Sequence, residues 1–324
     1  MARDNRLDTI KGLLIILVVM GHVITSTGIY NIINHGVMGL IYIFHMPLFI
    51  LISGYLTKHP DKQSPRDMWK SVGNIFLTIV IFQFLFALRV HYVNGGFMEV
   101  MELFPFGVLW YLFSLILWRL ILYYTPKQLL NKPLLYFGIA LVVSLLSGLT
   151  HLGTFLSLQR TMNFYPFFLM GFYYKQGDFN TPLWHNNKVH AAVAVLLLPL
   201  LFWLFPRCGN IMNGADYYGI AGLPEKVMVY TCSIVVSLLV FNLTRDIKWL
   251  RPIGRDSLFY YLYHMFILTL MMIGVVKPYG LPLTFPFVIL YTAVTMLILF
   301  VMSKIKLFRW LIHPTFKKRE KNTD

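Results

Sequence analysis

The sequence predicts an all-α integral membrane protein, a bundle of about ten transmembrane helices. Two observations support this prediction. Of the 324 residues, 57% are hydrophobic and 13% charged, with a mean hydropathy of +0.65, whereas a soluble domain carries about 25% charged residues. The apolar residues also fall into separate runs of about 17–22 residues, which cross a bilayer at about 1.5 Å per residue. One large soluble core is therefore excluded.

Ten segments have the length and composition of membrane spans. The fifth to seventh are the shortest or the most interrupted by polar residues. A basic, partly aromatic stretch follows the last span, so we expect a membrane domain at 1–303 and a basic cytoplasmic tail at 304–324 that rests on anionic lipid. The expected spans are residues 7–27, 36–57, 71–90, 104–124, 133–149, 157–174, 189–205, 226–244, 257–277 and 282–303.

The distribution of lysine and arginine predicts the orientation. With the N-terminus in the cytoplasm, 23 of the 28 basic residues fall on inside segments. This positive-inside bias predicts a multi-pass protein of the cell membrane with both termini in the cytoplasm. The net charge is +15, but the basic residues stand in short stretches between the apolar runs. This distribution argues against a nucleic-acid partner. The two cysteines, Cys208 and Cys232, are too few for a disulfide framework or a metal cluster, and we expect no metal site.

The first span, "RLDTIKGLLIILVVMGHV" (residues 6–23), carries a polar stripe. Lys11 and His22 are separated by about three helical turns, and Asp8 lies within about 40° of the same face. The stripe runs from a charged cytoplasmic entrance to an imidazole about 16 Å deeper. Ionisable groups in lipid cost several kcal/mol unless they face the bundle interior, so they are functional candidates. The alternatives are that Asp8 and Lys11 snorkel to headgroups and that His22 is hydrogen-bonded across helices.

The second span, "IYIFHMPLFILISGYL", places a proline two residues after His45. Pro47 frees the carbonyl of Ile43 and predicts a kink beside the histidine. Ser53 and Gly54 allow a neighbouring helix to approach closely. A kinked helix with a histidine at mid-depth suits a cavity wall. A packing kink with an internally satisfied histidine is the alternative.

Two later stretches add polar groups. In "RPIGRDSLFYYLYHMF" the spacing puts Ser257, Tyr261 and His264 on one helical face, with Ser257 as the expected helix cap. The tyrosines also suit an interfacial aromatic belt. Arg160 opens the sixth span, where a guanidinium suits an oxyanion, a carboxylate or a phosphate, or anchors the outer interface. Phosphate-binding loops, nucleophile elbows and zinc patterns of soluble enzymes are missing from the sequence.

The chain resembles the acyltransferase family 3 of bacterial membrane proteins, in particular its fucose-4-O-acetylase-like branch. The resemblance covers about 80% of the chain in family order. It rests on "RLDTIKGLLIILVVMGH" (residues 6–22), "FHMPLFILISGYL" (44–56), "LWYL" (109–112), "RTMNFYPFFLMGFYY" (160–174) and "IGRDSLFYYLYH" (253–264). The family pattern of a basic residue, ten residues and a histidine falls on Lys11 and His22. Many members have arginine at the basic position, and lysine lacks its bidentate fork.

The resemblance implies transfer of an acyl group, usually acetyl from acetyl-CoA, to an extracytoplasmic or lipid-linked glycan hydroxyl. Acetyl-CoA or another acyl-CoA would be the donor substrate, with no permanently bound cofactor. Arg6, Asp8 and Lys11 are the expected donor-binding residues. His22 is the expected general base or acyl carrier, assisted by Lys11 and His45. Acceptor contacts are expected from Arg160, Ser257, Tyr261, His264 and Trp110.

Two further functions stay open at this stage. A polytopic transporter or flippase for an envelope-glycan precursor fits the spans equally well, although mid-span carboxylates of the kind that proton-coupled carriers use are essentially missing from the sequence. The other possible function is that of a non-catalytic membrane subunit of an envelope-polymer assembly. Aromatic residues such as Trp110, Tyr111, Tyr217 and Tyr218, and the polar outer loop at 206–224 with Asn210, Asn213 and Asp216, are the expected places for acceptor contacts.

Overall fold

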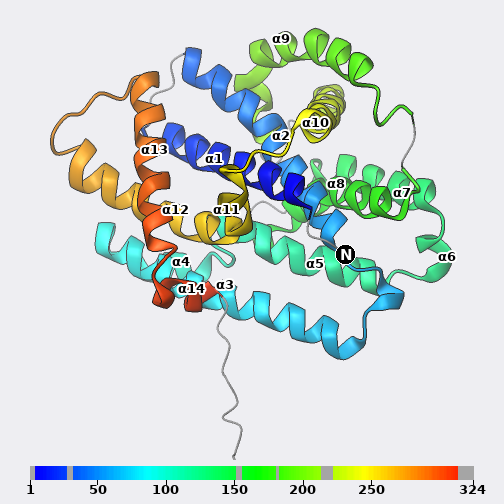
Figure 1. Cartoon of the computed structure of the whole chain (residues 1–324), viewed down its shortest axis with the longest axis horizontal. Helices are drawn as coiled ribbons and strands as arrows, with labels where there is room; N and C mark the ends of the chain where they lie inside the picture. The colour runs from blue at the N-terminus through cyan, green and yellow to red at the C-terminus, as the bar shows by residue number, and fades with distance from the viewer. Residues whose placement is uncertain (1–3, 28–31, 151–154, 180–181, 213–221, 313–324) are drawn as a thin grey trace, which may run out of the picture.

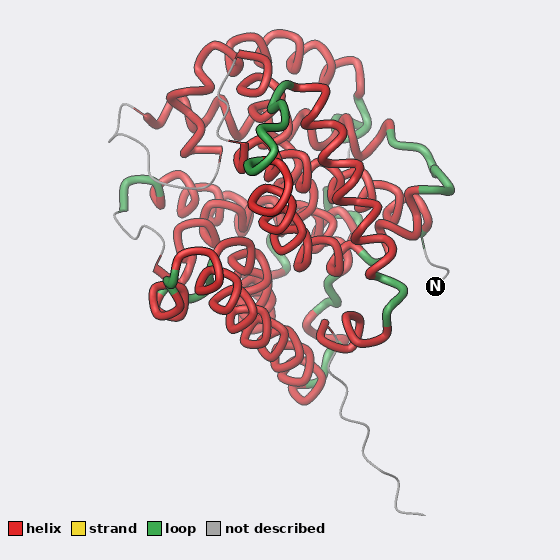
Figure 2. The backbone as a smooth tube through the Cα atoms, turned by 90° about the vertical axis from the view of Figure 1, so that its left-hand side faces the viewer, coloured by secondary structure: helices red, strands yellow, loops and turns green. Residues whose placement is uncertain are grey.

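The computed structural model describes residues 4–27, 32–150, 155–179, 182–212 and 222–312. Within these residues the chain forms helices and connecting loops, with no strand (Figure 2). The predicted all-α membrane bundle is therefore confirmed. The α-helices are α1 (Asn5–Thr27), α2 (Ile32–Leu56), α3 (Pro65–Asn94), α4 (Phe97–Glu102), α5 (Trp110–Tyr124), α6 (Lys127–Leu130), α7 (Pro133–Ser147), α8 (Leu158–Gln176), α9 (Asn187–Met212), α10 (Leu223–Leu243), α11 (Leu250–Arg255), α12 (Ser257–Met271), α13 (Phe285–Met302) and α14 (Lys306–Ile312).

Seven helical segments in the described part of the chain are long and apolar enough to cross a membrane, judged by length and composition. They correspond to the first four and the last three expected spans. The fifth and seventh expected spans are represented by the shorter apolar segments Pro133–Ser147 and Asn187–Pro199. Membrane crossing by α7, α8 and α9 thus stays a prediction. The seven are Asn5–Ser26, Gly36–Leu56, Pro65–Asn94, Phe97–Tyr124, Leu223–Leu243, Ser257–Val276 and Phe285–Met302.

Helix α8 takes the place of the sixth expected span but is more polar than the others. It carries Gln159, Arg160 and Asn163 in its first two turns. From Thr161 to Tyr173 its residues are buried almost continuously, because α8 packs against α2, α5 and α7. A helix surrounded by protein on all sides needs no lipid-compatible surface, which accounts for its composition.

Glycines set the closest helix crossings. A Cβ added to Gly54 of α2 would lie 1.9 Å from the carbonyl oxygen of Phe168, and one added to Gly171 of α8 would lie 1.8 Å from that of Leu51. The predicted close approach at Gly54 is therefore confirmed. Helices α1 and α11 meet in the same way, since a Cβ on Gly254 would lie 1.7 Å from the carbonyl oxygen of Asp8. Any larger residue would push these backbones apart.

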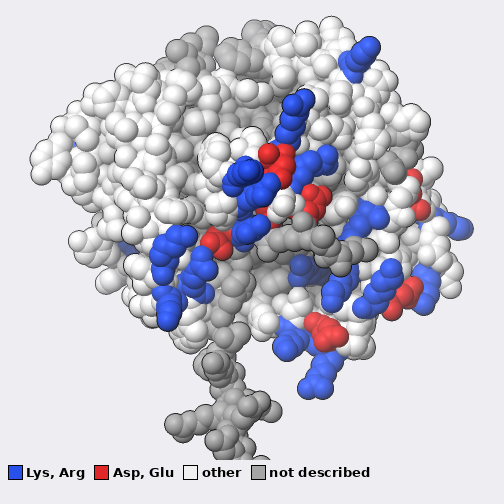
Figure 3. Space-filling view, viewed as in Figure 1, with Lys and Arg blue, Asp and Glu red and all other residues white. Residues whose placement is uncertain are grey.

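The helices converge around α1, which lies at the middle of the view in Figure 1, with α2 and α10 on one side and α12 and α13 on the other. Charged side chains gather around the start of α1, α11 and α14 and continue over the start of α3 and the region of α6, whereas the upper part of the same view is largely uncharged (Figure 3). This arrangement fits a bundle whose uncharged surface faces lipid.

Three local expectations need correction. Ser257 is the first residue of α12 and not its cap: Asp256 holds the N-cap position, with no side-chain capping bond. The seventh expected span ends at 205, but α9 continues to Met212, so 206–212 are helical and not loop. Residues 306–312 of the expected tail form α14, which packs on the bundle: Thr78 donates to the Ile312 carbonyl (3.0 Å) and Tyr263 to that of Phe308 (3.1 Å).

Candidate active site

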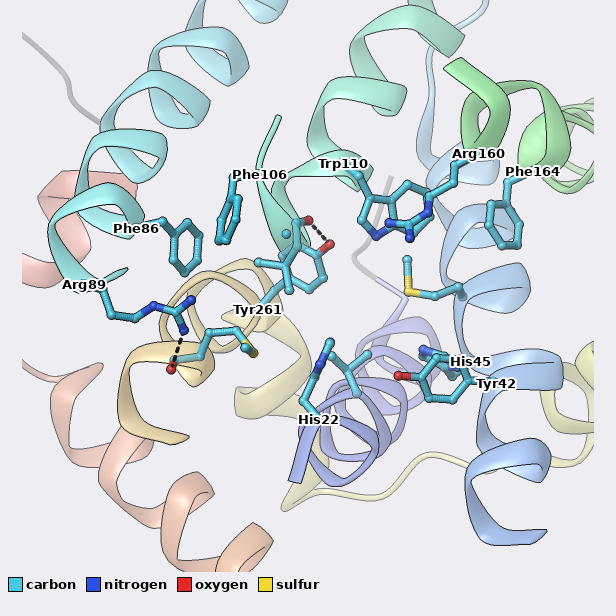
Figure 4. Close-up of a pocket in the computed structure, with 15 residues that line it drawn as sticks. His22, Tyr42, His45, Phe86, Arg89, Phe106, Trp110, Arg160, Phe164 and Tyr261 are labelled. Atoms are coloured by element: carbon cyan, nitrogen blue, oxygen red, sulfur yellow. Dashed lines mark hydrogen bonds between the residues drawn. The ribbon is translucent and has the colours of Figure 1, made fainter. Parts of the chain in front are cut away.

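A cavity of about 370 Å³, here called the histidine cavity, lies between α1, α2, α3, α5, α8 and α12. On α1, α3, α5 and α8, its residues stand in the helix halves that the charge distribution predicts to be extracytoplasmic. Figure 4 shows His22 and His45 on one wall, Arg89 and Phe86 on another, and Trp110 and Arg160 opposite His22. The lining residues are Val18, His22, Tyr42, His45, Met46, Phe86, Arg89, Phe106, Gly107, Val108, Trp110, Arg160, Phe164, Tyr261 and Met265.

The two cavity histidines differ in their hydrogen bonding. Nδ1 of His45 lies 2.8 Å from the carbonyl oxygen of Ile41, four residues earlier in α2. A carbonyl only accepts, so the neutral ring carries its proton on Nδ1 and leaves a lone pair on Nε2. The ring nitrogens of His22 have no hydrogen-bond partner recorded among the described residues, although Thr25 Oγ1 donates to its backbone carbonyl (3.1 Å). His22 is thus the histidine whose ring is left for a bound molecule.

His264 lies behind His22 and not in the cavity wall. The two ring centroids are 5.0 Å apart with the planes tilted by 39°. His264 is fully buried, and its Nδ1 donates to the carbonyls of Tyr261 (2.7 Å) and Tyr260 (3.1 Å). Its Nε2 is therefore unprotonated in the neutral ring, and it has no partner among the described residues. A buried acceptor of this kind suits an N–H of the neighbouring imidazole.

Two guanidinium groups reach the histidine cavity. Arg160 lies over the indole of Trp110, with its Cζ 5.4 Å from the ring centroid. Arg89 donates from Nη1 to the Met265 carbonyl (3.1 Å) and to Thr269 Oγ1 (3.0 Å). Neither forms an ion pair with an acidic residue in the described ranges, and the cavity lining contains no Asp or Glu. The cavity is therefore suited to an anion or a developing oxyanion.

A second cavity of about 450 Å³, here called the lysine cavity, lies between α1, α2, α3, α5, α12 and α14. Lys11, Arg119 and Ser257 line it. Arg119 donates from Nη1 to Ser71 Oγ (3.0 Å), and its Nε is buried without a partner among the described residues. The remaining lining residues are Phe49, Ile52, Ser53, Leu56, Ser71, Asn74, Ile75, Thr78, Tyr111, Leu112, Leu115, Leu258, Tyr261 and Ile312.

A tyrosine pair separates the two cavities. Tyr261 lines both cavities and donates its hydroxyl to the Val108 carbonyl. Its ring meets that of Tyr111 edge-on, with centroids 5.5 Å apart. Tyr111 is in turn hydrogen-bonded through its hydroxyl to Ser53 Oγ (2.6 Å). We call Tyr261 and Tyr111 the tyrosine partition. Any reaction between molecules from the two sides has to take place across it.

The structure distributes the predicted residues over these two cavities. Of the stripe on α1, Lys11 lines the lysine cavity and His22 the histidine cavity. Asp8 is buried and ion-paired, 2.9 Å from Lys11 Nζ and 3.4 Å from Arg255 Nε. A carboxylate repels phosphate, so this geometry suits Asp8 to holding Lys11 and not to binding a donor directly.

Other predicted residues lie apart from these centres. Arg6 lines neither cavity and packs on α10, its Cζ 4.9 Å from the ring centroid of Phe241. Ser257 lines the lysine cavity together with Tyr261, whereas Arg160 and Trp110 line the histidine cavity. Asn213, Asp216, Tyr217 and Tyr218 fall outside the described residues. Within the described ranges, no group of three or more His, Cys, Asp or Glu side chains is placed to hold a metal ion.

Arg89 and Arg119 were not singled out as site residues from the sequence. Each is an arginine within or near the end of a long apolar run, "TIVIFQFLFALRV" and "WYLFSLILWRLILYY". That position was itself a signal, because an intramembrane charge is costly without a partner or a wet cavity. Counting both as loop charges in the orientation argument concealed it.

Comparison with known proteins identifies the kind of domain. A family model described as an acyltransferase domain matches residues 4–304, nearly the whole chain. The chain belongs to the acyltransferase 3 family. The expected family resemblance is thereby confirmed, and the matched range contains the lining of both cavities except Ile312.

A curated relative supports the assignment over a shorter range. The nodulation protein NolL of Sinorhizobium fredii (strain NBRC 101917 / NGR234) is 30% identical over 219 residues, which cover 62% of this chain and 58% of NolL. The chain thus matches less than two thirds of the length of this relative. No solved structure matches the chain.

Proposed function

We propose that the protein is a membrane-bound O-acyltransferase that moves an acyl group, in the first place acetyl, from cytoplasmic acyl-CoA to a hydroxyl of an extracytoplasmic or lipid-linked glycan. The observation that carries the proposal is the pair of cavities that meet at Tyr261. One presents cations at the basic end of α1, and the other presents an unbonded imidazole. A transferase that joins a donor and an acceptor from opposite sides needs two such chambers.

The lysine cavity is the proposed donor site. Lys11 and Arg119 supply two cations, and the buried Nε of Arg119 is a donor without a protein partner. Both suit phosphate oxygens of coenzyme A, which form strong charge-assisted hydrogen bonds. The pantetheine arm would extend along the apolar lining towards the tyrosine partition and present the thioester to the histidine cavity.

The histidine cavity is the proposed acceptor site, with His22 as the general base. His22 removes the proton of the acceptor hydroxyl as its oxygen attacks the thioester carbonyl. The C–S bond then breaks, an ester C–O bond remains on the acceptor, and the proton on His22 passes to the thiolate to give free CoA. Covalent acyl transfer through His22 is the variant route. Direct transfer makes fewer demands, because only one tetrahedral intermediate forms.

The neighbouring groups fit supporting roles. When His22 takes the proton, the unpartnered Nε2 of His264 is the proposed acceptor for an N–H of the imidazolium and so stabilises it. Arg160 is the best placed donor for the developing oxyanion, since the N–H of His45 already points to the Ile41 carbonyl. His45 Nε2 is left to accept a hydrogen bond from the acceptor. A positioned base typically contributes about 10²–10⁴-fold, and an oxyanion donor about 10²–10³-fold.

The test is the ester-linked acetate of cell-surface glycans in a deletion strain. The strain is complemented with the intact protein, with His22→Ala, or with His91→Ala at matched membrane abundance. His91 is the control because it is exposed at the end of α3, where its ring only approaches the Gly95 carbonyl (3.4 Å). We expect acetate to disappear on deletion and to return with the intact protein and with the His91 variant, but not with His22→Ala.

Full restoration by His22→Ala would remove His22 from the chemistry. It would favour a carrier or a non-catalytic subunit, because neither needs a base at this position. To separate these two, labelled glycan precursor is followed across the membrane in the deletion strain: a carrier predicts that translocation stops, and a subunit predicts that it continues.

A further inference from the structure

An open apolar groove joins the histidine cavity from the side of the membrane. It has a volume of about 380 Å³ and lies between α3 and α12; we call it the α3–α12 groove. Its walls include exposed apolar side chains, among them Leu88 (44% exposed) and Leu270 (62% exposed). The lining residues are Leu85, Leu88, Arg89, Tyr92, Val93, Phe266, Thr269, Leu270, Ile273 and Gly274.

Arg89 is the residue that the groove and the histidine cavity share. In Figure 4 its guanidinium points from α3 towards the side where His22 and Tyr261 lie. Nη1 is fixed on α12 by Met265 and Thr269, and the guanidinium lies over the rings of Phe86 (5.2 Å) and Phe266 (5.9 Å). These contacts hold the side chain at the junction of the groove and the cavity.

The charge of Arg89 is not balanced within the described chain. It has no acidic partner among the described ion pairs, and its Nε is buried without a hydrogen-bond partner in that part of the structure. Neither the groove nor the cavity is lined by Asp or Glu. A cation beside an apolar, lipid-facing groove is costly unless an anion compensates it. The complementary ligand is therefore an anion attached to a hydrocarbon chain.

The shared lining decides which part of that ligand enters the cavity. Arg89 and His22 both line the histidine cavity. An anion held by Arg89 thus lies at the edge of the space that His22 faces, and whatever is attached to its far side extends into the histidine cavity. An ordinary bilayer lipid would instead direct its head group to the water, with its phosphate at the interface.

We propose that the α3–α12 groove binds the hydrocarbon chain of a lipid phosphate, that Arg89 binds the phosphate, and that the head group carries the acceptor hydroxyl into the histidine cavity. The acceptor is thus lipid-linked and enters laterally from the bilayer. The statement about the hydroxyl rests on the proposed acyl transfer, whereas binding of the lipid phosphate does not.

Photocrosslinking in nanodiscs of uncharged phosphatidylcholine tests the binding. The full-length protein carries p-benzoylphenylalanine in place of Leu88 in the groove, or in place of Ile139 on α7, which is equally exposed at 44% and lines none of these cavities. The probes are tritiated polyprenyl phosphate and the tritiated polyprenol of the same chain length, each with and without excess phosphatidylglycerol.

We expect the groove position to label with the phosphate far more than with the alcohol, and position 139 to label with both alike. Arg89→Gln should reduce the phosphate labelling about tenfold, the effect of one charge-assisted hydrogen bond, and leave the alcohol unchanged. Arg89→Lys should keep part of the labelling because the charge remains. His22→Ala should label like the intact protein, so binding is scored independently of transfer.

Equal labelling by the phosphate and the alcohol, or full competition by phosphatidylglycerol, would overturn the proposal and make the groove a site for ordinary lipid. The comparison of the two probes needs only the unsubstituted Arg89, so it decides even where the Arg89 variants do not fold. If His22→Ala loses glycan acetate while the phosphate and the alcohol probes label the groove equally, the proposed lipid phosphate site is refuted and the proposed acyl transfer stands.

Discussion

Removing the imidazole of His264 should slow the chemical step without weakening binding. His264 is fully buried behind His22 and lines neither cavity. Its Nε2 has no partner among the described residues and lies next to the His22 ring, with the two ring centroids 5.0 Å apart, so it is the acceptor that we expect a charged His22 to use. A hydrogen bond to a charged group contributes about 1.5–3 kcal/mol, so His264→Ala should reduce kcat about 10- to 150-fold. KM for acyl-CoA should change little, because the lysine cavity is intact.

The assay is acyl transfer by the purified protein in nanodiscs, with kcat and KM measured separately. His264→Gln is the conservative variant, since an amide oxygen can replace the acceptor and should recover part of kcat. A merely structural role predicts that both variants lose stability and activity together. Equal kcat for the intact protein and His264→Ala, at equal thermal stability, would refute the positioning role.

Three further predictions follow from other parts of the structure. Arg119→Gln should raise KM for acyl-CoA about tenfold through the loss of one charge-assisted hydrogen bond. The control Arg66→Gln, at an exposed position, should leave this KM unchanged. Steady-state kinetics at varied acyl-CoA concentration distinguishes the two variants. Gly171→Ala should lower the free energy of unfolding by about 1–3 kcal/mol or more through overpacking, because its Cβ would lie 1.8 Å from the Leu51 carbonyl oxygen. The control is Gly73→Ala in α3, which should be neutral or stabilising because nothing lies within 4 Å of the new Cβ. Thermal unfolding in one detergent compares the two variants. An unchanged unfolding midpoint for Gly171→Ala would contradict the packing argument. On the loops, a hydrogen bond from Lys127 lowers the pKa of Asp61 below its ordinary value of 3.8, so the pair stabilises the fold above that pH and loses its effect as the pH falls through the lowered pKa. The difference in the free energy of unfolding between the intact protein and Asp61→Asn should therefore vanish at low pH. A difference that persists there would refute the role of this pair.

The long apolar runs and the charge bias predicted most of the fold. The helices that carry His22, His45 and His264 were all found from apolar runs of the length of a membrane span, and Gly54 was placed at a close helix crossing. These features are local, because they depend on residues within a few turns of one another. The helical periodicity put Lys11 and His22 on one face of α1, and the structure assigns that face to two successive cavities.

The division between those cavities could not be predicted. It depends on Tyr261 of α12 meeting Tyr111 of α5 and the Val108 carbonyl, and such a contact between distant segments is not encoded in local spacing. The burial of α8 is similar: the polar residues of its first turns suggested a weak span, whereas the surrounding helices supply its partners. Arg6 was misplaced for a related reason, since the packing of α10 decides where its side chain goes.

The tyrosine partition also has an electrical consequence. A membrane potential of about 100 mV drives each crossing unit charge with about 2.3 kcal/mol, and a continuous file of water between two chambers would dissipate it. The hydroxyl groups of Tyr261 and Tyr111 are hydrogen-bonded to the Val108 carbonyl and to Ser53 Oγ, so neither is free to carry protons between the chambers. In the proposed reaction the thioester arm displaces this seal, and an arm that fills the opening replaces the insulation it removes. On that proposal the protein stays closed to ions with or without its donor.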